Sequence, residues 1–208
     1  MPHLLLVRHG KSEWNKLGLW TGRVDVDLAE EGRAEARAAA AVLQEFFIHE
    51  AHVSALKRAQ QTLSEIQTTL GLADLPIKTN AALNERHYGI HTGKNKWQVK
   101  EEVGEELFTK IRRGWDHPIP EGETLKDVHQ RVVLYYNDFI VPSLQEEKNV
   151  LIVAHGNSLR ALMKHIENIS DEAIADVELQ TAEACCYLLS NDGTFVSKEM
   201  RFGGEKKG

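Results

Sequence analysis

The stretch LLLVRHGKSEWN, from Leu4 to Asn15, starts with four apolar residues and turns polar at Arg8, His9 and Gly10. An uninterrupted apolar run is typical of a strand that is buried on both faces, as in a parallel sheet. We therefore expect a buried strand over residues 3–7, with the arginine and the histidine at its carboxyl end.

A second stretch, NVLIVAHGNS, repeats this pattern from Asn149 to Ser158. An apolar strand again ends at His155 and Gly156, and a helix is expected from Asn157. In parallel α/β sheets, ligands bind beyond the carboxyl ends of the strands. One histidine at a strand end is more often a loop residue than a catalyst, but two at equivalent strand ends indicate a shared site. We expect His9 and His155 to lie at the same rim of the sheet.

The rest of the chain alternates strand and helix patterns. Further helices are expected near Ser12 and at about 30–47, 58–70, 94–106, 107–114 and 124–144, and further strands at 53–56, 76–83, 182–190 and 194–202, the last two joined by a turn at 191–193. This alternation predicts an α/β fold of three layers, in which helices flank a mainly parallel sheet. We expect a single domain over residues 1–208, with residues 84–120 as a capping insertion at the edge of the sheet.

The composition limits the function classes. The chain has 208 residues and a net charge of −6 at pH 7, whereas a general nucleic-acid binder is more often basic. No apolar stretch approaches the roughly 20 residues of a membrane span, and the N-terminal run is too short for a signal peptide. The adjacent Cys185 and Cys186 point to opposite faces of a strand and are not expected to pair. No metal-site spacing occurs. We expect a cytoplasmic protein with neither a nucleic-acid nor a membrane partner.

Cationic groups converge on the rim that carries the two histidines. Arg8 follows the first strand, and Arg58, in ALKRAQQT, lies where another strand passes into a helix. The N-termini of the helices near Ser12 and at Asn157 favour anions, and the planar guanidinium group suits phosphate oxygens. Glu85, in LNERHYG, is a carboxylate without metal-binding neighbours, so acid–base catalysis is its expected role. Together these residues predict a pocket for a phosphate-like anion.

Several short motifs occur in a fixed order between about residues 3 and 170. They are RHG with Ser12, Trp14 and Asn15, then Thr21–Gly22, LKRAQQT, LNERHYG, Asn95–Lys96, Arg112–Gly114 and AHGNSLRAL. In this order they resemble the cofactor-dependent phosphoglycerate mutases of the histidine phosphatase superfamily. RHG alone is typical of the whole superfamily, whereas LNERHYG, RRG and HGNSLRAL together favour the mutases over generic phosphatases.

The resemblance implies a role for each residue at the rim. His9 is the implied nucleophile, phosphorylated at Nε2, with its Nδ1–H held by a nearby backbone carbonyl. Arg8, Arg58 and His155 would surround the transferred phosphoryl group, and Glu85 would carry the proton of the substrate hydroxyl. The implied substrate-binding residues are Ser12, Asn15, Thr21, Gly22, Arg86, His87, Tyr88, Lys96, Arg112, Arg113, Gly156 and Asn157. The set assigned to the substrate carboxylate and the second phosphate is Tyr88, Lys96, Arg112 and Arg113.

The implied activity is the interconversion of 3-phosphoglycerate and 2-phosphoglycerate in glycolysis and gluconeogenesis through a phosphohistidine. 2,3-Bisphosphoglycerate would prime the enzyme as its cofactor, and no metal would be needed. Two other classes stay open: a phosphatase of the same superfamily, in which water takes the phosphoryl group, and an inactive binding module. The second anion subsite favours the mutase over the phosphatase. The presence of His9, Glu85 and His155 opposes the inactive module, and bisphosphoglycerate synthesis stays open as a side activity.

Three features depart from the usual pattern of this family. Lys11 follows RHG where a glutamate is usual, the connection WDHPIPEGET after Gly114 is short, and the tail after Phe202 is only GGEKKG. The longer connection of relatives contributes to oligomer contacts, so the short connection favours a monomer here and leaves an oligomer open. We expect this short tail to leave the site more open to water, which would favour some hydrolysis.

Overall fold

The computed structural model describes residues 1–190 and 193–203. The strands are β1 (His3–Arg8), β2 (Glu50–Ser54), β3 (Ile77–Asn80), β4 (Val150–Ala154), β5 (Ala184–Leu189) and β6 (Phe195–Arg201). The α-helices are α1 (Glu13–Lys16), α2 (Glu30–Leu43), α3 (Lys57–Leu70), α4 (Lys96–Val103), α5 (Glu105–Arg113), α6 (Leu125–Tyr135), α7 (Val141–Gln145) and α8 (Gly156–Glu167). A π-helical segment, Tyr136–Ile140, joins α6 to α7.

The six strands form one sheet in the order β3-β2-β4-β1-β5-β6. The first four strands of this order run parallel to one another, β5 runs antiparallel to β1, and β6 runs antiparallel to β5. The prediction of a mainly parallel sheet is confirmed. Because β1 and β4 are adjacent, their carboxyl ends bring Arg8–Gly10 and His155–Gly156 to the same rim, as expected.

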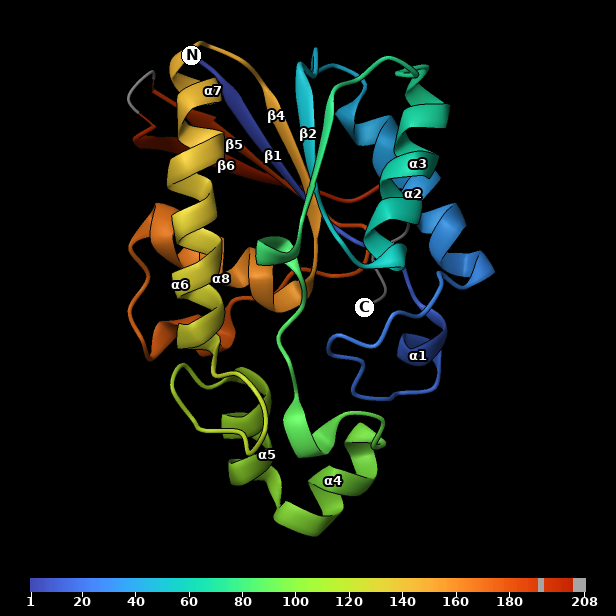
Figure 1. Ribbon diagram of the computed structural model, residues 1–208, viewed down its shortest axis with the longest axis vertical. Helices are drawn as coiled ribbons and strands as arrows, with labels where there is room; N and C mark the ends of the chain where they lie inside the picture. The colour runs from blue at the N-terminus through green and yellow to red at the C-terminus, as the bar shows by residue number, and fades with distance from the viewer. Residues whose placement is uncertain (191–192, 204–208) are drawn as a thin grey trace.

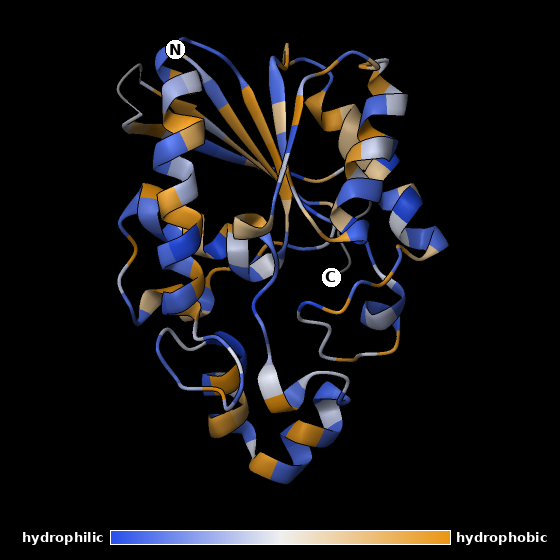
Figure 2. Cartoon of the chain, in the orientation of Figure 1, coloured by the Kyte–Doolittle hydropathy of each residue, from blue (hydrophilic) through white to orange (hydrophobic). Residues whose placement is uncertain are grey.

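Alternate side chains of the central strands build two separate cores. Leu5 and Val7 of β1 belong to a core that they share with residues of α2 and α3. Leu4 and Leu6 face the other way and share a core with residues of α6 and α8. Figure 1 shows these helix pairs on opposite sides of the sheet, and Figure 2 shows the hydrophobic strands between them. The three-layer prediction is confirmed.

Residues 84–120, called the capping segment below, lie beyond the carboxyl ends of the strands (Figure 1). Helices α4 and α5 enclose a small third core that includes Tyr88, Phe108 and Ile111. Trp20, from the loop after α1, completes this core and is fully buried. The apolar contact with Trp20 ties the capping segment to the loop that follows the first strand.

The second strand begins earlier than predicted. β2 covers Glu50–Ser54, whereas the sequence pattern indicated residues 53–56. Glu50 and His52 look like exposed residues in the sequence, but both are buried, and His52 Nε2 lies 2.9 Å from Glu50 Oε1. Ser143 Oγ also donates to Glu50 Oε1, at 2.6 Å. These polar residues are buried because they form hydrogen bonds with one another. They interrupt the apolar pattern, so the first part of the strand could not be recognised from the sequence.

Other predicted boundaries were wrong by a few residues for local reasons. The strand expected at 76–83 ends at Asn80, because its side chain accepts from Ala82 N and starts a 3₁₀ turn at Ala81–Leu83. The helix expected at 30–47 ends at Leu43. The helix expected at 124–144 is interrupted by the π-helical segment.

Two features of the sequence analysis fall on residues that the structure leaves undescribed. The turn expected at 191–193 lies outside the described residues except for Gly193, and so does the tail from residue 204 onward. Across residues 1–190 and 193–203, no helix has both the length and the apolar character that a membrane crossing requires.

Two glycines allow the loop after β1 to pass against the first turn of α2. A Cβ atom at Gly32 would lie 2.0 Å from Lys11 O, and one at Gly10 would lie 2.2 Å from Gly32 O. These distances are far below van der Waals contact, so the two backbones meet only because both side chains are absent. The crossing also carries a hydrogen bond from Ala29 N to Lys11 O at 2.9 Å. It fixes the path of the chain next to His9.

We expect Gly32→Ala to destabilise the fold although the residue lies in a helix. Glycine to alanine in a helix normally stabilises by about 1 kcal/mol, but forcing a methyl group into a filled space costs roughly 1–3 kcal/mol. Urea unfolding should therefore show a lower midpoint. The matched control is Gly156→Ala, at the start of α8, where the new Cβ would lie 3.6 Å from the Arg8 guanidinium, an ordinary contact. A stabilised Gly32→Ala protein would contradict the close crossing.

Candidate active site

His9 lies just beyond β1 and is only 2% exposed. Its Nδ1 lies 2.7 Å from Gly10 O, so this nitrogen carries the proton and donates it to the carbonyl. Nε2 then carries the lone pair, and Arg58 Nε donates to it at 3.4 Å. Burial, together with the charges of Arg58 and Arg8, holds the pKa of His9 well below its usual value. The ring is therefore neutral at pH 7, with Nε2 available as a nucleophile.

Backbone carbonyl oxygens hold the two arginines beside His9. Arg58 Nη1 donates to Val24 O at 3.0 Å, and its Nη2 donates to Gly22 O at 2.8 Å. Arg8 Nη1 donates to Leu179 O at 2.5 Å. A carbonyl oxygen satisfies an N–H group without cancelling the charge, so both cations stay available to an anion. Burial lowers the pKa of Arg58 to about 10, which leaves it cationic at neutral pH.

His155 packs against His9, with the ring centroids 4.9 Å apart. Its Nε2 lies 2.7 Å from Ser54 Oγ, and this hydroxyl donates to Asn84 Oδ1 at 2.8 Å. Because the hydroxyl hydrogen is directed to Asn84, His155 Nε2 carries a proton and donates it to Ser54. Nδ1 is buried and has no hydrogen-bond partner among the residues described. Burial, followed by the charge of Arg58, holds the pKa of His155 well below its usual value.

Glu85 places its carboxylate in the same cavity and is only 8% exposed. Its Oε1 accepts from Arg86 N at 2.8 Å, from Asn157 Nδ2 at 3.0 Å and from Asn157 N at 3.2 Å. In the described part of the chain no hydrogen bond falls on Oε2, so this oxygen can accept a proton from a hydroxyl in the cavity. The three donors hold the carboxylate in one orientation.

Arg160 fixes the orientation of Asn157 in turn. Arg160 Nη1 donates to Asn157 Oδ1 at 3.0 Å, so the amide must present its Nδ2–H groups to Glu85 and to the hydroxyl of Tyr88. The other end of the guanidinium donates to Arg113 O at 3.1 Å and to Ile174 O at 2.6 Å. Arg160 therefore connects α8 to the capping segment and, through Asn157, to the carboxylate of Glu85.

The capping segment supplies further cations to the cavity that His9 lines. Lys96 comes from the start of α4, and Arg112 and Arg113 come from the end of α5. Burial lowers the pKa of Lys96 to about 8, and the charges of Arg112 and Arg8 act in the same direction. Two sets of cations thus line the cavity, one from the rim of the sheet and one from the capping segment, and they are called its two basic zones below.

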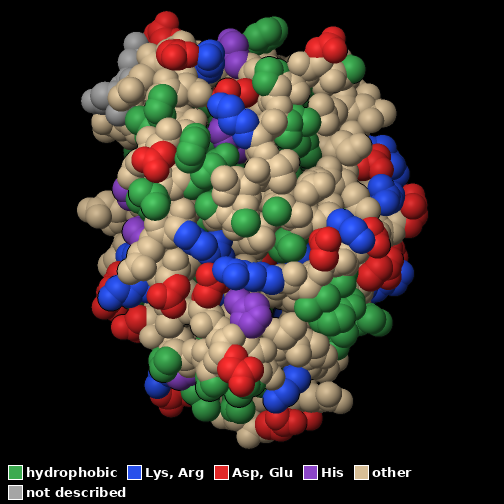
Figure 3. Space-filling view, in the orientation of Figure 1, with side chains coloured by type: hydrophobic (Ala, Val, Ile, Leu, Met, Phe, Trp, Pro, Cys, Tyr) green, Lys and Arg blue, Asp and Glu red, His purple; other side chains and the backbone are tan. Residues whose placement is uncertain are grey.

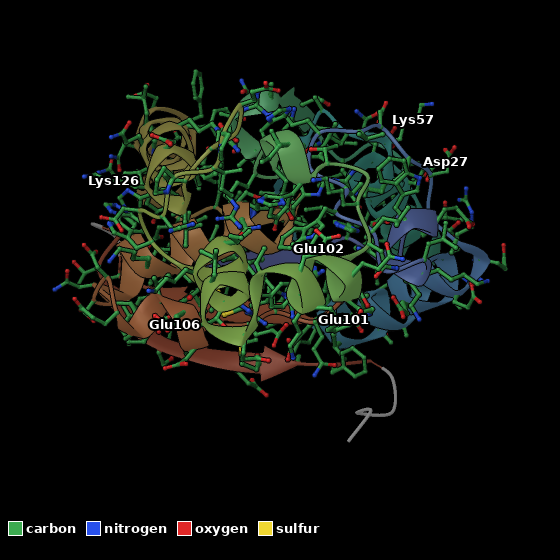
Figure 4. All side chains as sticks on the ribbon, turned by 90° about the horizontal axis from the view of Figure 1, so that it is seen from below. Asp27, Lys57, Glu101, Glu102, Glu106 and Lys126 are labelled. Atoms are coloured by element: carbon green, nitrogen blue, oxygen red, sulfur yellow. The ribbon has the colours of Figure 1, made fainter. Side chains whose placement is uncertain are left out.

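Acidic residues lie on the outside of the capping segment. Glu101, Glu102 and Glu106 are exposed and are labelled in Figure 4, which views this segment from below. On the face in Figure 3, Lys and Arg side chains gather in a band across the middle of the molecule, with Asp and Glu beside them. The net negative charge of the protein is therefore compatible with a basic cavity, because these three carboxylates lie on the exterior of the capping segment.

Most residues expected at the site do line one cavity. The lining residues among them are Arg8, His9, Asn15, Thr21, Gly22, Arg58, Glu85, Tyr88, Lys96, Arg112, Arg113, Gly156 and Asn157. His155 lies behind this lining, against His9.

The structure places three predicted substrate-binding residues outside the cavity lining. Ser12 Oγ accepts from Asn15 N at 3.2 Å and caps α1. Arg86 is fully buried, and its Nη2 donates to Ile111 O at 2.6 Å, which holds the end of α5. His87 Nδ1 accepts from Gly89 N at 3.2 Å. These side chains are not among the residues that line the cavity, and their hydrogen bonds shape the backbone around it.

Sequence reasoning missed four residues of the cavity lining. They are Trp20, Arg160, Glu178 and Leu179. Arg160 follows Asn157 by three positions on α8, so helical spacing could have indicated it. Trp20 precedes the expected Thr21. For the other two, the local sequence holds no signal.

The structure gives no site for cysteine or metal chemistry within the residues it describes. No group of three or more His, Cys, Asp or Glu side chains that could hold a metal ion occurs there. Cys185 and Cys186 are buried and unpaired, and burial raises their pKa values to about 11 and about 12.

Comparison with known families agrees with this geometry. A family model described as the histidine phosphatase superfamily, branch 1, matches residues 4–201. A relative from Cytophaga hutchinsonii, a 2,3-bisphosphoglycerate-dependent phosphoglycerate mutase, is 48% identical over 92% of this chain and 89% of its own. A relative of the same name from Bradyrhizobium diazoefficiens is 46% identical over 94% of this chain and 95% of its own.

Solved structures share the fold at lower identity. YhfR of Bacillus stearothermophilus gives a TM-score of 0.82 at 24% identity, over 94% of this chain and 95% of that chain. A mycobacterial glucosyl-3-phosphoglycerate phosphatase in complex with VO3 gives 0.80 at 22% identity, over 97% of both chains. These two likenesses concern the fold alone. The family match and the curated relatives carry the assignment: the chain belongs to branch 1 of the histidine phosphatase superfamily and, within it, to the family of 2,3-bisphosphoglycerate-dependent phosphoglycerate mutases.

Proposed function

We propose that the chain interconverts 3-phosphoglycerate and 2-phosphoglycerate through a phosphohistidine at His9. The observation that carries this proposal is the cavity with two basic zones, one around His9 and one formed by Lys96, Arg112 and Arg113. A bisphosphorylated molecule needs both zones, whereas transfer of one phosphoryl group to water needs only the first. The family relationship supports the same activity.

His9 Nε2 takes and returns the phosphoryl group. In the forward half-reaction, the bond between Nε2 and phosphorus breaks and a bond forms between phosphorus and the substrate hydroxyl oxygen. Glu85 accepts the hydroxyl proton at Oε2. In the second half-reaction the other phosphate transfers to Nε2, and Glu85 returns the proton to the oxygen that loses it. Phosphate and protons balance over the cycle, and His9 ends phosphorylated as it began.

Arg8, Arg58 and His155 stabilise the charge of the phosphoryl group in flight. The two guanidinium groups are already held in place by carbonyl oxygens, so they do not reorganise when negative charge develops. His155 adds Nδ1, which is buried beside His9 and can take a proton when phosphoryl charge approaches. This preorganised positive charge is the expected main source of rate enhancement.

The cofactor and the setting are part of the same proposal. 2,3-Bisphosphoglycerate supplies the phosphoryl group that primes His9, and its two anionic ends fit the two basic zones of the cavity. The ligands are small phosphoglycerates, and the residues that hold them need no metal ion. The chain acts as one domain with residues 84–120 as its cap, as a monomer in the cytoplasm.

The covalent intermediate is the most direct prediction of this mechanism. Incubation with 2,3-bisphosphoglycerate should add the mass of one phosphoryl group, and the group should be labile in acid, as a phosphohistidine is. His9→Ala should show no such mass, because the nucleophilic Nε2 is absent. Intact-protein mass spectrometry at neutral and acid pH measures both. The same mass gain in His9→Ala would place the phosphoryl group elsewhere.

Lys96 should give the reaction an alkaline limit. With a pKa of about 8, the lysine is cationic below that pH and loses its charge above it, so attraction for the anionic substrate should weaken as pH rises. The pH profile of kcat/KM, which reports groups of the free enzyme, should fall above about pH 8. Lys96→Arg keeps the charge at all these pH values and should remove this limb. If kcat/KM of Lys96→Arg fell at the same pH as in the wild type, another group would be responsible for the alkaline limit.

Arg112 and Arg113 should matter for mutase activity far more than for hydrolysis. Hydrogen bonds to charged groups contribute roughly 1.5–3 kcal/mol each, so Arg112→Ala/Arg113→Ala should reduce mutase activity by at least two orders of magnitude. Hydrolysis of a small phosphate monoester, which needs only the rim residues, should fall much less.

The ratio of the two activities is therefore the quantity to measure. Lys110→Ala is a suitable control, because Lys110 lies on the same helix but pairs with Glu106 on the exposed side. Equal loss of both activities in a folded double variant would place these arginines at the reacting phosphate. Wild-type mutase activity and wild-type hydrolysis in the double variant would show that the two arginines are solvated and have no role in either reaction.

A further inference from the structure

The cavity holds a carboxylate that the proposed mechanism does not use. Two acidic side chains line it, Glu85 and Glu178. Glu85 is oriented by three N–H donors and is assigned to proton transfer. Glu178 instead lies in the second basic zone, where the proposed function places an anionic group of the ligand.

Glu178 is paired with the arginines of that zone. Its Oε1 lies 2.7 Å from Arg113 Nη2 and 4.0 Å from Arg112 Nη2. Burial alone would raise the pKa of Glu178, but the charge of Arg113 and the hydrogen bond from it, with the charge of Arg112, bring that pKa below its usual value. The carboxylate is therefore ionised at neutral pH and neutralises part of the zone.

The position of Arg113 does not depend on Glu178 alone. Arg113 Nη1 donates to Val177 O at 3.2 Å, and Arg113 O accepts from Arg160 Nη2 at 3.1 Å. The next residue after Glu178 is also tied down, because Leu179 O accepts from Arg8 at the rim. Half of the Glu178 side chain is exposed, 52%, so the carboxylate can turn outward while the backbone on both sides stays in place.

We propose that Glu178 is an internal counter-ion of the second anion subsite, which the second anionic group of a ligand displaces from Arg113 and Arg112. This inference rests on the proposed function, because it needs a ligand with two anionic ends. It makes Glu178 a specificity-determining residue that weakens the binding of phosphoglycerates relative to the strength that the bare arginines would give. A bisphosphorylated intermediate is then held less tightly, which allows it to turn around and to leave.

The exchange distinguishes two kinds of ligand. An ion that binds only at the His9 rim, such as vanadate, leaves the Glu178–Arg113 pair intact. A molecule with a second phosphate or carboxylate has to replace it. Removing the charge of Glu178 should therefore tighten the second kind of ligand and leave the first unchanged. A residue that only supports the structure would not improve binding when changed.

The test compares His9→Ala with His9→Ala/Glu178→Gln, since the alanine prevents turnover and glutamine keeps the shape and one hydrogen-bond acceptor. Calorimetric titration with 2,3-bisphosphoglycerate should show a dissociation constant lower by roughly 1.5- to fivefold in the double variant, the range for one exposed ion pair. The gain should shrink as salt is raised from low ionic strength, because the interaction is screened.

Two controls accompany this titration. Glu172→Gln, also in the His9→Ala background, makes the same change of charge at an exposed residue outside the cavity, and it should leave the dissociation constant unchanged. With His9 intact, Glu178→Gln should leave inhibition by vanadate unchanged.

The outcomes separate this inference from the proposed function. A lower dissociation constant for bisphosphoglycerate, together with unchanged inhibition by vanadate, supports the counter-ion role. Equal or weaker bisphosphoglycerate binding in the Glu178 variant, with clear binding in His9→Ala, overturns the counter-ion role and leaves the mutase proposal standing. An equal gain in affinity with Glu172→Gln also overturns the counter-ion role, since the change in net charge would then be the cause. No binding to His9→Ala at all would overturn both.

Discussion

The site depends on holding several guanidinium groups beside a buried neutral histidine without cancelling their charge. Carboxylates would satisfy the N–H groups but would also neutralise them. The structure uses backbone carbonyl oxygens for this purpose: Gly22 and Val24 for Arg58, and Leu179 for Arg8. Each carbonyl belongs to a loop that the sheet and its helices keep in place. The positions of these loops therefore determine how much positive charge faces His9.

The same arrangement connects the two ends of the cavity. Arg160 bonds to Asn157, which orients Glu85, and to the carbonyl of Arg113 at the end of α5. A shift of the capping segment would thus reach the carboxylate of Glu85, to which the proposed function assigns the proton transfer. In the proposed function, the rim would carry out the chemistry and the capping segment would hold the far end of the ligand, which suits a reaction in which the ligand turns around between two transfers.

The rim could be predicted from the sequence because it follows from the topology. A parallel sheet brings the carboxyl ends of its strands to one rim, so both His-Gly pairs were expected there, and His9 and His155 are in contact because β1 and β4 are neighbours. Burial of β2 could not be recognised, because Glu50 and His52 satisfy each other inside the fold. The motif that contains a residue also does not show in which direction its side chain points. Arg86 adjoins Glu85 in LNERHYG, yet it turns away to hold the end of α5.

Contacts between distant segments were beyond sequence reasoning. Glu178 enters the cavity only because the backbone around it is tied to Arg113 and Arg8, and neither tie has a local signal. The close passage of Gly10 over Gly32 is of the same kind, since each glycine alone is unremarkable in its sequence context. Such features depend on the three-dimensional path of the chain and become visible only with it.

The account is tested most directly by the fate of the phosphate of 3-phosphoglycerate. The protein is incubated with this substrate, with and without a catalytic amount of 2,3-bisphosphoglycerate, while 2-phosphoglycerate and inorganic phosphate are quantified together. The account predicts that 2-phosphoglycerate forms, that bisphosphoglycerate strongly accelerates its formation, and that little inorganic phosphate is released. Release of phosphate as the main product, or conversion with no dependence on bisphosphoglycerate, would contradict it.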